Sequence, residues 1–111
     1  MQRKYDENNV FFKIINGDLP CNKVSEDDKI LSFHDVNPKA PVHVLVVPKN
    51  KYVSFNDFIK NASEEEITHF FKIAQQIAEN LKLKSYRIMA NCGEMAGQVV
   101  YHYHLHILGY N

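Results

Sequence analysis

Three histidines, His102, His104 and His106, alternate with aromatic or aliphatic residues near the end of the chain. This alternation predicts a β-strand from about Val99 to Leu108, in which side chains two residues apart point to the same face. The three imidazoles would then share one face, with successive rings roughly 6.6 Å apart. The opposite face would pack under helices and would carry Tyr101, Tyr103, Leu105 and Ile107. Apolar packing does not require three histidines on one face, so the triplet is the candidate site.

Three interpretations of the triplet differ in their chemistry. The histidines could simply be exposed on the surface. Two of them could share a zinc ion, with a third ligand from His43, His34, Asp35 or Cys92, but the chain has no Cys-x-x-Cys or His-Glu-x-x-His motif. The third interpretation is nucleophilic attack on phosphorus by the central His104, because a neutral imidazole is a competent nucleophile near pH 7. It uses all three residues, since the neighbours would orient His104, contact phosphate and disfavour a charge on it.

The loop before the histidines supports the third interpretation. Residues 91–98 contain two glycines, at which the backbone can approach an anion closely. Successive amide groups there could form a nest for phosphate oxygens. The alternative is an ordinary hairpin connection.

The elements that must position this site follow from the hydrophobic pattern. The clearest is a helix from about Glu64 to Leu81, with apolar residues at i, i+3, i+4 and i+7 and a capping box of Ser63 and Glu66. A short helix is expected from Val10, capped by Asn8 or Asn9 and ended by Gly17, and residues 54–61 fit either a short helix or a loop. Strands are expected over 29–35, 43–47, 86–91 and 99–108. The order predicts an α+β fold with an antiparallel sheet of about five strands and one long and one short helix.

The bulk composition narrows the class of protein. The chain has 111 residues, which suits one domain over 10–111, and the polar residues 1–9 are expected to be disordered or frayed. Thirteen basic and thirteen acidic side chains balance, so no footprint for nucleic acid or an anionic membrane is expected. No signal peptide or membrane span is apparent, and two cysteines make no disulfide framework. These features predict a cytoplasmic location with free thiols.

The stretch 102–108, His-Tyr-His-Leu-His-Ile-Leu, resembles the His-x-His-x-His-x-x signature of the histidine triad (HIT) superfamily. The upstream stretch 32–49, Ser-Phe-His-Asp-Val-Asn-Pro-Lys-Ala-Pro-Val-His-Val-Leu-Val-Val-Pro-Lys, is similar to the nucleotide-binding segment of the Hint branch. Residues 11–15, 18–20 and 26–28 also match that branch. The resemblance covers about Val10 to Leu108 and implies a HIT-like fold.

The resemblance also implies an activity. Hint-type proteins hydrolyse purine nucleoside phosphoramidates, and act on aminoacyl-adenylate-like anhydrides, through a nucleotidyl-histidine intermediate without a required cofactor or metal. By this resemblance His104 is the nucleophile, His106 contacts the phosphate and helps protonate the leaving group, and His102 orients His104. His43 approaches from the neighbouring strand. The implied nucleotide contacts are Asp35 at the ribose, Phe11, Ile14, Phe33 and Leu45 around the base with His34 beside it, and Asn91, Gly97 and Gln98 at the phosphate.

Two departures from the Hint pattern affect the expectations. Val99 stands where many Hint proteins have a serine near the reacting phosphate, and the chain ends three residues after Leu108, which predicts a more open site and broader amine tolerance. The expected partners are an AMP-type purine nucleotide and a second copy of the chain, with the long helix and a sheet edge at the interface. Dinucleoside polyphosphate hydrolysis is the nearest alternative activity, although Asn91 replaces the glutamine of that branch. A nucleotide-binding scaffold without turnover is the alternative from another class.

Overall fold

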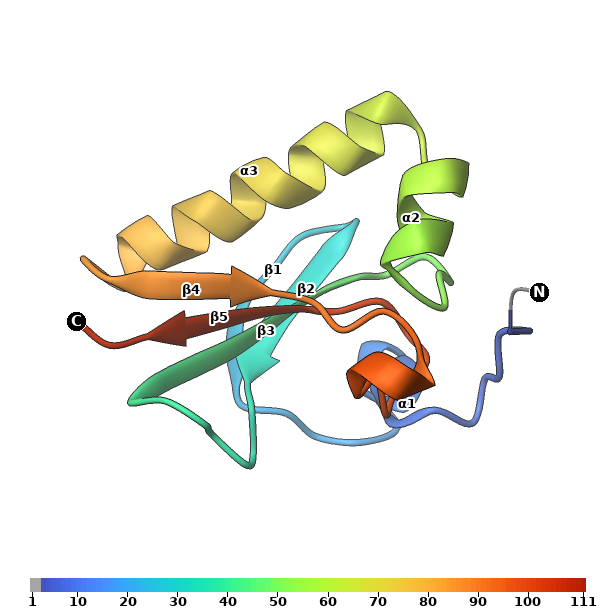
Figure 1. Cartoon of the computed structure of the whole chain (residues 1–111), viewed down its shortest axis with the longest axis horizontal. Coiled ribbons are helices and arrows are strands. Elements are labelled where there is room, and N and C mark those ends of the chain that lie inside the picture. The colour runs from blue at the N-terminus through green and yellow to red at the C-terminus, as the bar shows by residue number, and fades with distance from the viewer. Residues whose placement is uncertain (1–2) are drawn as a thin grey trace.

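The computed structural model describes residues 3–111 and contains one antiparallel sheet of five strands in the order β1-β2-β3-β5-β4 (Figure 1). The elements are α1 (Val10–Ile15), β1 (Lys23–Glu26), β2 (Ile30–His34), β3 (Val42–Pro48), α2 (Phe55–Asn61), α3 (Glu64–Asn80), β4 (Tyr86–Met89), the short 3-10 helix η1 (Glu94–Ala96) and β5 (Leu105–Gly109). The predicted α+β class with an antiparallel sheet is confirmed. A second short helix, α2, forms over the segment that the pattern left open.

The two faces of the sheet are covered by different helices, as Figure 1 shows. Alternate residues of β3 and β5, among them Val44, Val46 and Ile107, pack with the apolar sides of α2 and α3 in the larger core. The residues between them, such as Leu45 and Val47, pack with α1 in a smaller core on the other face. The period-two pattern of the strands therefore separates a structural face from the face that carries α1.

The long helix begins as its capping residue predicts. The hydroxyl of Ser63 accepts a hydrogen bond from the backbone N–H of Glu66 at 3.0 Å. The carboxylate of Glu66 does not complete a reciprocal box, because it accepts from the phenol of Tyr52 at 2.9 Å instead. The helix face formed by Phe70, Ala74 and Ile77 is buried against the sheet, so periodicity here marks intramolecular core.

The last strand is shorter than the histidine pattern predicts, since it begins at Leu105 rather than near Val99. The backbone of the residues before Leu105 makes hydrogen bonds to groups that are not in the sheet. The backbone N–H of Tyr103 donates to the carbonyl of Tyr52 at 2.7 Å. The prediction of a continuous strand over 99–108 is wrong because the segment before Leu105 satisfies its polar groups with loops and side chains.

The segment expected to be disordered or frayed, residues 1–9, lies partly outside the described residues, which begin at Arg3. From Tyr5 onward it makes defined contacts, and Asn9 caps α1 by accepting a hydrogen bond from the N–H of Phe12 at 2.9 Å. None of the helices within residues 3–111 combines the length and the apolar character needed to cross a bilayer.

Candidate active site

The three histidines of the triplet lie on the face of the sheet that carries α1. Tyr103, between the first two, points the other way and packs against Phe58 and Phe70 of the larger core. His104 instead meets Phe11 of α1 edge to face, with ring centroids 4.8 Å apart. The alternation of faces thus holds through residues 102–106, even though the regular strand starts only at Leu105.

The ring of His104 has a tautomer set by the backbone. Its Nδ1 lies 2.7 Å from the carbonyl oxygen of His102, which can only accept a hydrogen bond. Nδ1 therefore carries the hydrogen, and in the neutral ring Nε2 keeps its lone pair. Burial lowers the pKa of His104 below its ordinary value of 6.5, which favours the neutral ring. A neutral imidazole with a free Nε2 lone pair is the form that can attack phosphorus.

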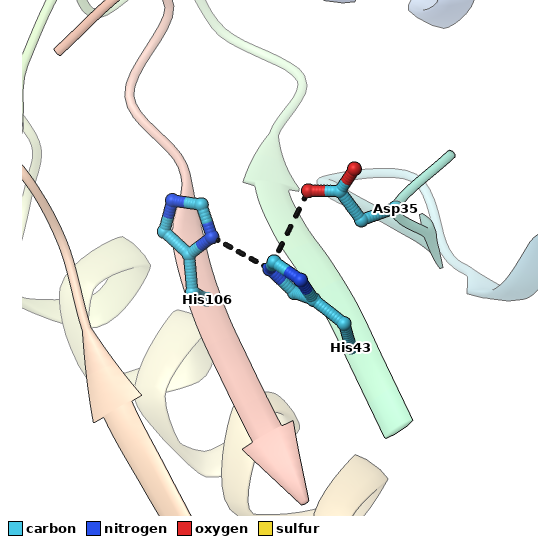
Figure 2. Close-up of side chains that lie close together, drawn as sticks. All are labelled: Asp35, His43 and His106. Carbon is cyan, nitrogen blue, oxygen red and sulfur yellow. Dashed lines mark hydrogen bonds and ion pairs between the residues drawn. The ribbon is translucent and has the colours of Figure 1, made fainter. Parts of the chain in front are cut away.

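The ring of His106 has the tautomer opposite to that of His104, because of two successive hydrogen bonds that start at the backbone of Lys39. The backbone N–H of Lys39 donates to Nδ1 of His43 at 3.0 Å, so the hydrogen of His43 is on Nε2. That Nε2–H donates to Nδ1 of His106 at 2.9 Å (Figure 2). The hydrogen of His106 therefore sits on its own Nε2.

Nε2 of His106 is the unpaired donor of the site. The atom is buried and has no hydrogen-bond partner within residues 3–111, and a buried donor without a partner is costly. Burial and the neighbouring imidazoles His104 and His43 lower the pKa of His106 to about 4. At neutral pH the site thus offers a lone pair on His104 and an unsatisfied N–H on His106, which suits an acceptor such as a phosphate oxygen.

Asp35, His43 and His106 are also the group that best fits a metal ion by proximity, with ligand atoms within 4.8 Å of one another. Figure 2 shows His43 between the other two, with a carboxylate oxygen of Asp35 3.4 Å from Nε2 of His43. The donor from Lys39 argues against a metal, since a metal ion at Nε2 would need the hydrogen on Nδ1, facing another N–H. The set is better described as a hydrogen-bonded relay than as a ligand set. Neither His34 nor Cys92, the other ligands considered from the sequence, belongs to it.

His102, the first histidine of the triplet, is fully buried and takes no open position in the site. Its Nε2–H donates to the carbonyl oxygen of Pro48, the last residue of β3, at 2.7 Å. Burial lowers its pKa to about 4, so the ring is neutral. His102 therefore orients His104 with its backbone carbonyl, while its ring holds the segment against β3.

The residues predicted to surround a base gather in the smaller core. Phe11, Phe33 and Leu45 are buried together there, with Ile14 packed against them. Phe11 joins this cluster to the triplet through its contact with His104.

Asp35 follows β2 directly, and His34 is the last residue of that strand. One carboxylate oxygen of Asp35 accepts from the N–H of Asn37 at 2.8 Å, and the other faces His43. The sequence-predicted base and ribose residues are thus brought to the same end of the sheet as the histidines.

The loop 91–98 is tied together by Gln98, whose side chain is buried. Its amide nitrogen donates to the carbonyl oxygens of Val53 at 2.7 Å and Val100 at 3.1 Å, and its amide oxygen accepts from the N–H of Gly93 at 2.9 Å. These bonds occupy the side chain of a residue that the resemblance places at the phosphate. Gln98 therefore shapes the loop, and its side chain would have to leave three partners to bind a phosphate.

The other predicted phosphate residues remain at the rim of the loop. Gly97 has a φ of +95°, which favours glycine, and a Cβ there would lie 3.8 Å from the side-chain amide of Asn91. The N–H of Gly97 donates to Glu94 and that of Gln98 to Gly93, so these two amide groups are used within the loop. Val99 is 83% exposed, and Asn91 is half-buried.

Three partners of the histidines were not found from the sequence. They are the N–H of Lys39, the carbonyl of Pro48 and the phenol of Tyr5, whose hydroxyl lies 2.5 Å from Nδ1 of His102. The first two are backbone groups, which exist at every residue and give no side-chain signal. Tyr5 lies in a polar stretch far from the triplet in sequence, and only the folded chain brings it there.

The chain is similar to known proteins over most of its length. A family model described as the HIT domain matches residues 16–111. An uncharacterised 13.2 kDa HIT-like protein of Azospirillum brasilense is 46% identical over 109 residues, covering 96% of this chain and 89% of that protein. The solved structure of a HIT family hydrolase from Legionella pneumophila has a TM-score of 0.85 and 38% identity, and the match covers 94% of each chain. A HIT family hydrolase from Clostridium thermocellum has a TM-score of 0.83 and 40% identity, with 96% of this chain and 93% of that chain covered.

Proposed function

The chain belongs to the HIT family, and from this premise we propose that it hydrolyses purine nucleoside 5′-phosphoramidates or mixed anhydrides of AMP through a nucleotidyl-histidine intermediate. The observation that carries the proposal is the pair of opposite tautomers in one motif. His104 has a lone pair on Nε2, and His106 has an unsatisfied N–H on Nε2. A nucleophile and a donor for the phosphate are what this reaction needs.

In the first step, Nε2 of His104 forms a bond to phosphorus while the bond to the leaving nitrogen or oxygen breaks. The Nδ1–H of the adduct, which now carries positive charge, stays bonded to the carbonyl of His102. The anionic phosphate favours protonation of the His43–His106 pair, and Asp35 at 3.4 Å from His43 stabilises the added charge. The pair can then supply the proton that the leaving amine takes.

In the second step, water attacks phosphorus and the bond to His104 breaks, which releases AMP. The proton that water loses returns to the His43–His106 pair. The pair is then protonated as it was before the first step, and it releases this proton to solvent when AMP leaves. We also propose that no cofactor or metal is required, since the Lys39 N–H holds His43 in a tautomer unsuited to a metal.

The finer assignment to the Hint-like branch is part of the proposal. It is supported by the clustering of Phe11, Phe33 and Leu45 next to His104 and by Asp35 at the end of β2. A planar apolar base would lie against the cluster, and the carboxylate would accept from ribose hydroxyls. A cytoplasmic location belongs to the same proposal, and both cysteines are free thiols.

We propose further that the protein is a homodimer, with the free edge of the sheet in the interface. β4 is an edge strand, and it is exposed along its length. Three of its large apolar side chains, Tyr86, Ile88 and Met89, are uncovered, as is Phe71 of α3. An exposed apolar edge strand is a surface that proteins usually pair or cover.

The test is hydrolysis of adenosine 5′-phosphoramidate, followed as AMP release in the presence of a chelator. The wild-type protein should turn over, and His104→Ala should lose activity by roughly a thousandfold or more while still binding AMP and folding normally. Diadenosine polyphosphate serves as the competing substrate, and a preference for it would move the protein to the dinucleotide-hydrolysing branch. Equal activity of wild type and His104→Ala, or loss of activity in chelator, would contradict the mechanism. AMP binding without any turnover would favour a scaffold protein.

A further inference from the structure

The segment before α1 reaches across to the first histidine of the triplet. The hydroxyl of Tyr5 lies 2.5 Å from Nδ1 of His102, although the two residues are 97 positions apart in sequence. The phenol ring meets the imidazole edge to face at 5.6 Å between centroids and meets Phe12 in the same way at 5.9 Å. Tyr5 is therefore packed from two sides and bonded at its hydroxyl.

The direction of this hydrogen bond follows from the other side of the ring. Nε2 of His102 carries the hydrogen that is donated to the carbonyl of Pro48. In the neutral ring Nδ1 must accept, so the hydroxyl of Tyr5 donates. Burial raises the pKa of Tyr5, which keeps the phenol protonated and able to donate. Because His102 is fully buried, water cannot easily replace this donor.

The ring of His102 is joined to the nucleophile by its own backbone. The same residue offers its carbonyl to the Nδ1–H of His104 at 2.7 Å. The position of that carbonyl depends on where the ring is held, between Tyr5 on one side and Pro48 on the other. A shift of the ring would move the only acceptor that the structure gives to Nδ1 of His104 within residues 3–111.

Two further contacts lie on either side of Tyr5 in the same segment. Glu7 forms an ion pair with Lys51, which follows β3. The guanidinium of Arg3 lies over the ring of Tyr101, 3.8 Å from its centroid. Tyr5 itself is held by its ring contacts with Phe12 and His102 and by its bond to His102, and the exposed Glu7–Lys51 pair is a neighbour in the same segment.

We propose that Tyr5 is a positioning residue for catalysis, which holds His102 so that its carbonyl fixes the tautomer and direction of His104. The inference rests on the proposed hydrolytic function and deepens it. It assigns a role in the reaction to a residue outside the triad, outside the nucleotide pocket and before the first helix.

The test is Tyr5→Phe, which removes only the hydroxyl and keeps the ring that packs on Phe12. We expect kcat for the phosphoramidate to fall roughly tenfold, while KM and the AMP dissociation constant change by about twofold or less. The nitrogen NMR signal of His102 Nδ1 should move toward the value of an unbonded ring nitrogen, since Nδ1 loses its donor. The second bond, to Pro48, should keep the hydrogen on Nε2.

The matched control is Glu7→Gln, which removes an exposed ion pair of the same segment without touching His102. Its kcat should stay within about twofold of wild type, because exposed ion pairs contribute little. Equal losses of kcat in both variants, in step with their melting temperatures, would reduce Tyr5 to a structural anchor and overturn the proposal. An unchanged kcat in Tyr5→Phe would also overturn it.

The NMR arm separates this proposal from the proposed function. If the wild-type protein does not hydrolyse the phosphoramidate, the proposed function fails and the catalytic role of Tyr5 fails with it. The signals of His102 and His104 still report whether Tyr5 sets their geometry. If the wild-type protein is active and Tyr5→Phe has the same kcat, the hydrolytic function stands and only the role of Tyr5 is rejected.

Discussion

The histidines of the site have the same side chain but different tautomers, because each ring has a different hydrogen-bond partner at Nδ1. A carbonyl at Nδ1 leaves His104, the proposed nucleophile, with a lone pair on Nε2, and a donor at Nδ1 makes His106 a donor at Nε2. The roles are thus assigned by obligate backbone groups at the start of each chain of hydrogen bonds, the carbonyl of His102 and the N–H of Lys39. Burial then keeps the rings neutral, because it lowers the pKa of each histidine in the site.

The neutral state of His102 predicts a dependence of stability on pH. Its pKa is about 4 in the folded protein and about 6.5 in the unfolded chain. Between these two pH values His102 is protonated in the unfolded chain but not in the folded protein, which favours unfolding. Stability is therefore full above pH 6.5 and falls as the pH drops toward 4, by roughly 3 kcal/mol for this residue. Urea unfolding at several pH values between 7.5 and 4.5 measures the change.

The variant His102→Asn isolates the contribution of His102 to the pH dependence of stability. Its loss of unfolding free energy on acidification should be smaller than that of wild type by roughly 3 kcal/mol. Identical pH profiles for the variant and the wild type would show that His102 titrates normally. His69 gives a matched comparison, since it is half-exposed and paired with Asp27 at 2.8 Å. His69→Gln should leave the acid profile above pH 5 close to that of wild type, because a surface ion pair contributes about 1 kcal/mol or less.

At the scale of elements, the site depends on a segment that is neither strand nor free loop. Residues 99–104 lie between η1 and β5 and do not pair with a strand of the sheet. They are held by side-chain bonds to backbone carbonyls, from His102 to Pro48 and from Gln98 to Val100. This arrangement places His102 and His104 near His106 of β5, although neither of them lies in the strand.

Gln98→Ala tests whether the loop 91–98 depends on the hydrogen bonds of the Gln98 side chain. The change leaves the N–H of Gly93 and the carbonyl of Val53 without this partner, which should cost about 2 kcal/mol of unfolding free energy. It should also weaken AMP binding severalfold, because the loop borders the site. Chemical unfolding and calorimetric titration with AMP measure the two effects.

Gln75→Ala is the control for this loop variant, since Gln75 is exposed on α3 and far from the loop in the chain. Both its stability and its AMP affinity should match those of wild type. If Gln98→Ala lowers stability but leaves AMP affinity unchanged, then the loop does not contact the nucleotide.

At the scale of the whole molecule, the helices cover the sheet unevenly. α3 packs on one face of the sheet and α1 on the other (Figure 1), and the side chains of the edge strand β4 remain exposed. The apolar residues of this edge, with Phe71 beside them, are the basis for the proposed dimer. The triplet lies in β5 and the segment before it, and β5 is the direct neighbour of β4 in the sheet.

The dimer is tested by sedimentation velocity. The wild-type protein should sediment at twice the chain mass of 12.9 kDa, and Ile88→Lys should shift it to the monomer. Ile88 is 44% exposed, so the lysine can reach solvent in the folded monomer and the fold should persist. Leu19→Lys, at a residue 39% exposed on the loop after α1, should leave the mass unchanged. A wild-type monomer at micromolar concentration would contradict the dimer.

The sequence by itself determined helices α1 and α3 and the separation of faces and singled out the candidate site, but it left α2 open. Ser63 and Asn9 start their helices as their hydrogen-bonding side chains require, and alternation sends Tyr103 to one face and His104 to the other. These features are local, because caps act over three residues and faces follow from a period of two. Local patterns did not place β1, which is short and half-exposed, or the start of β5.

Only the tertiary structure decided which nitrogen of His102 and of His106 carries the hydrogen. The sequence places three imidazoles on one face, but the protons of His102 and His106 are set by groups from β3 (Pro48), the loop before it (Lys39) and the N-terminal segment (Tyr5). Such partners lie far apart in the chain, and two of the three are backbone atoms that no residue type reveals. The physical reason is that a tautomer is determined by the nearest obligate donor or acceptor, and that neighbour exists only once the chain has folded.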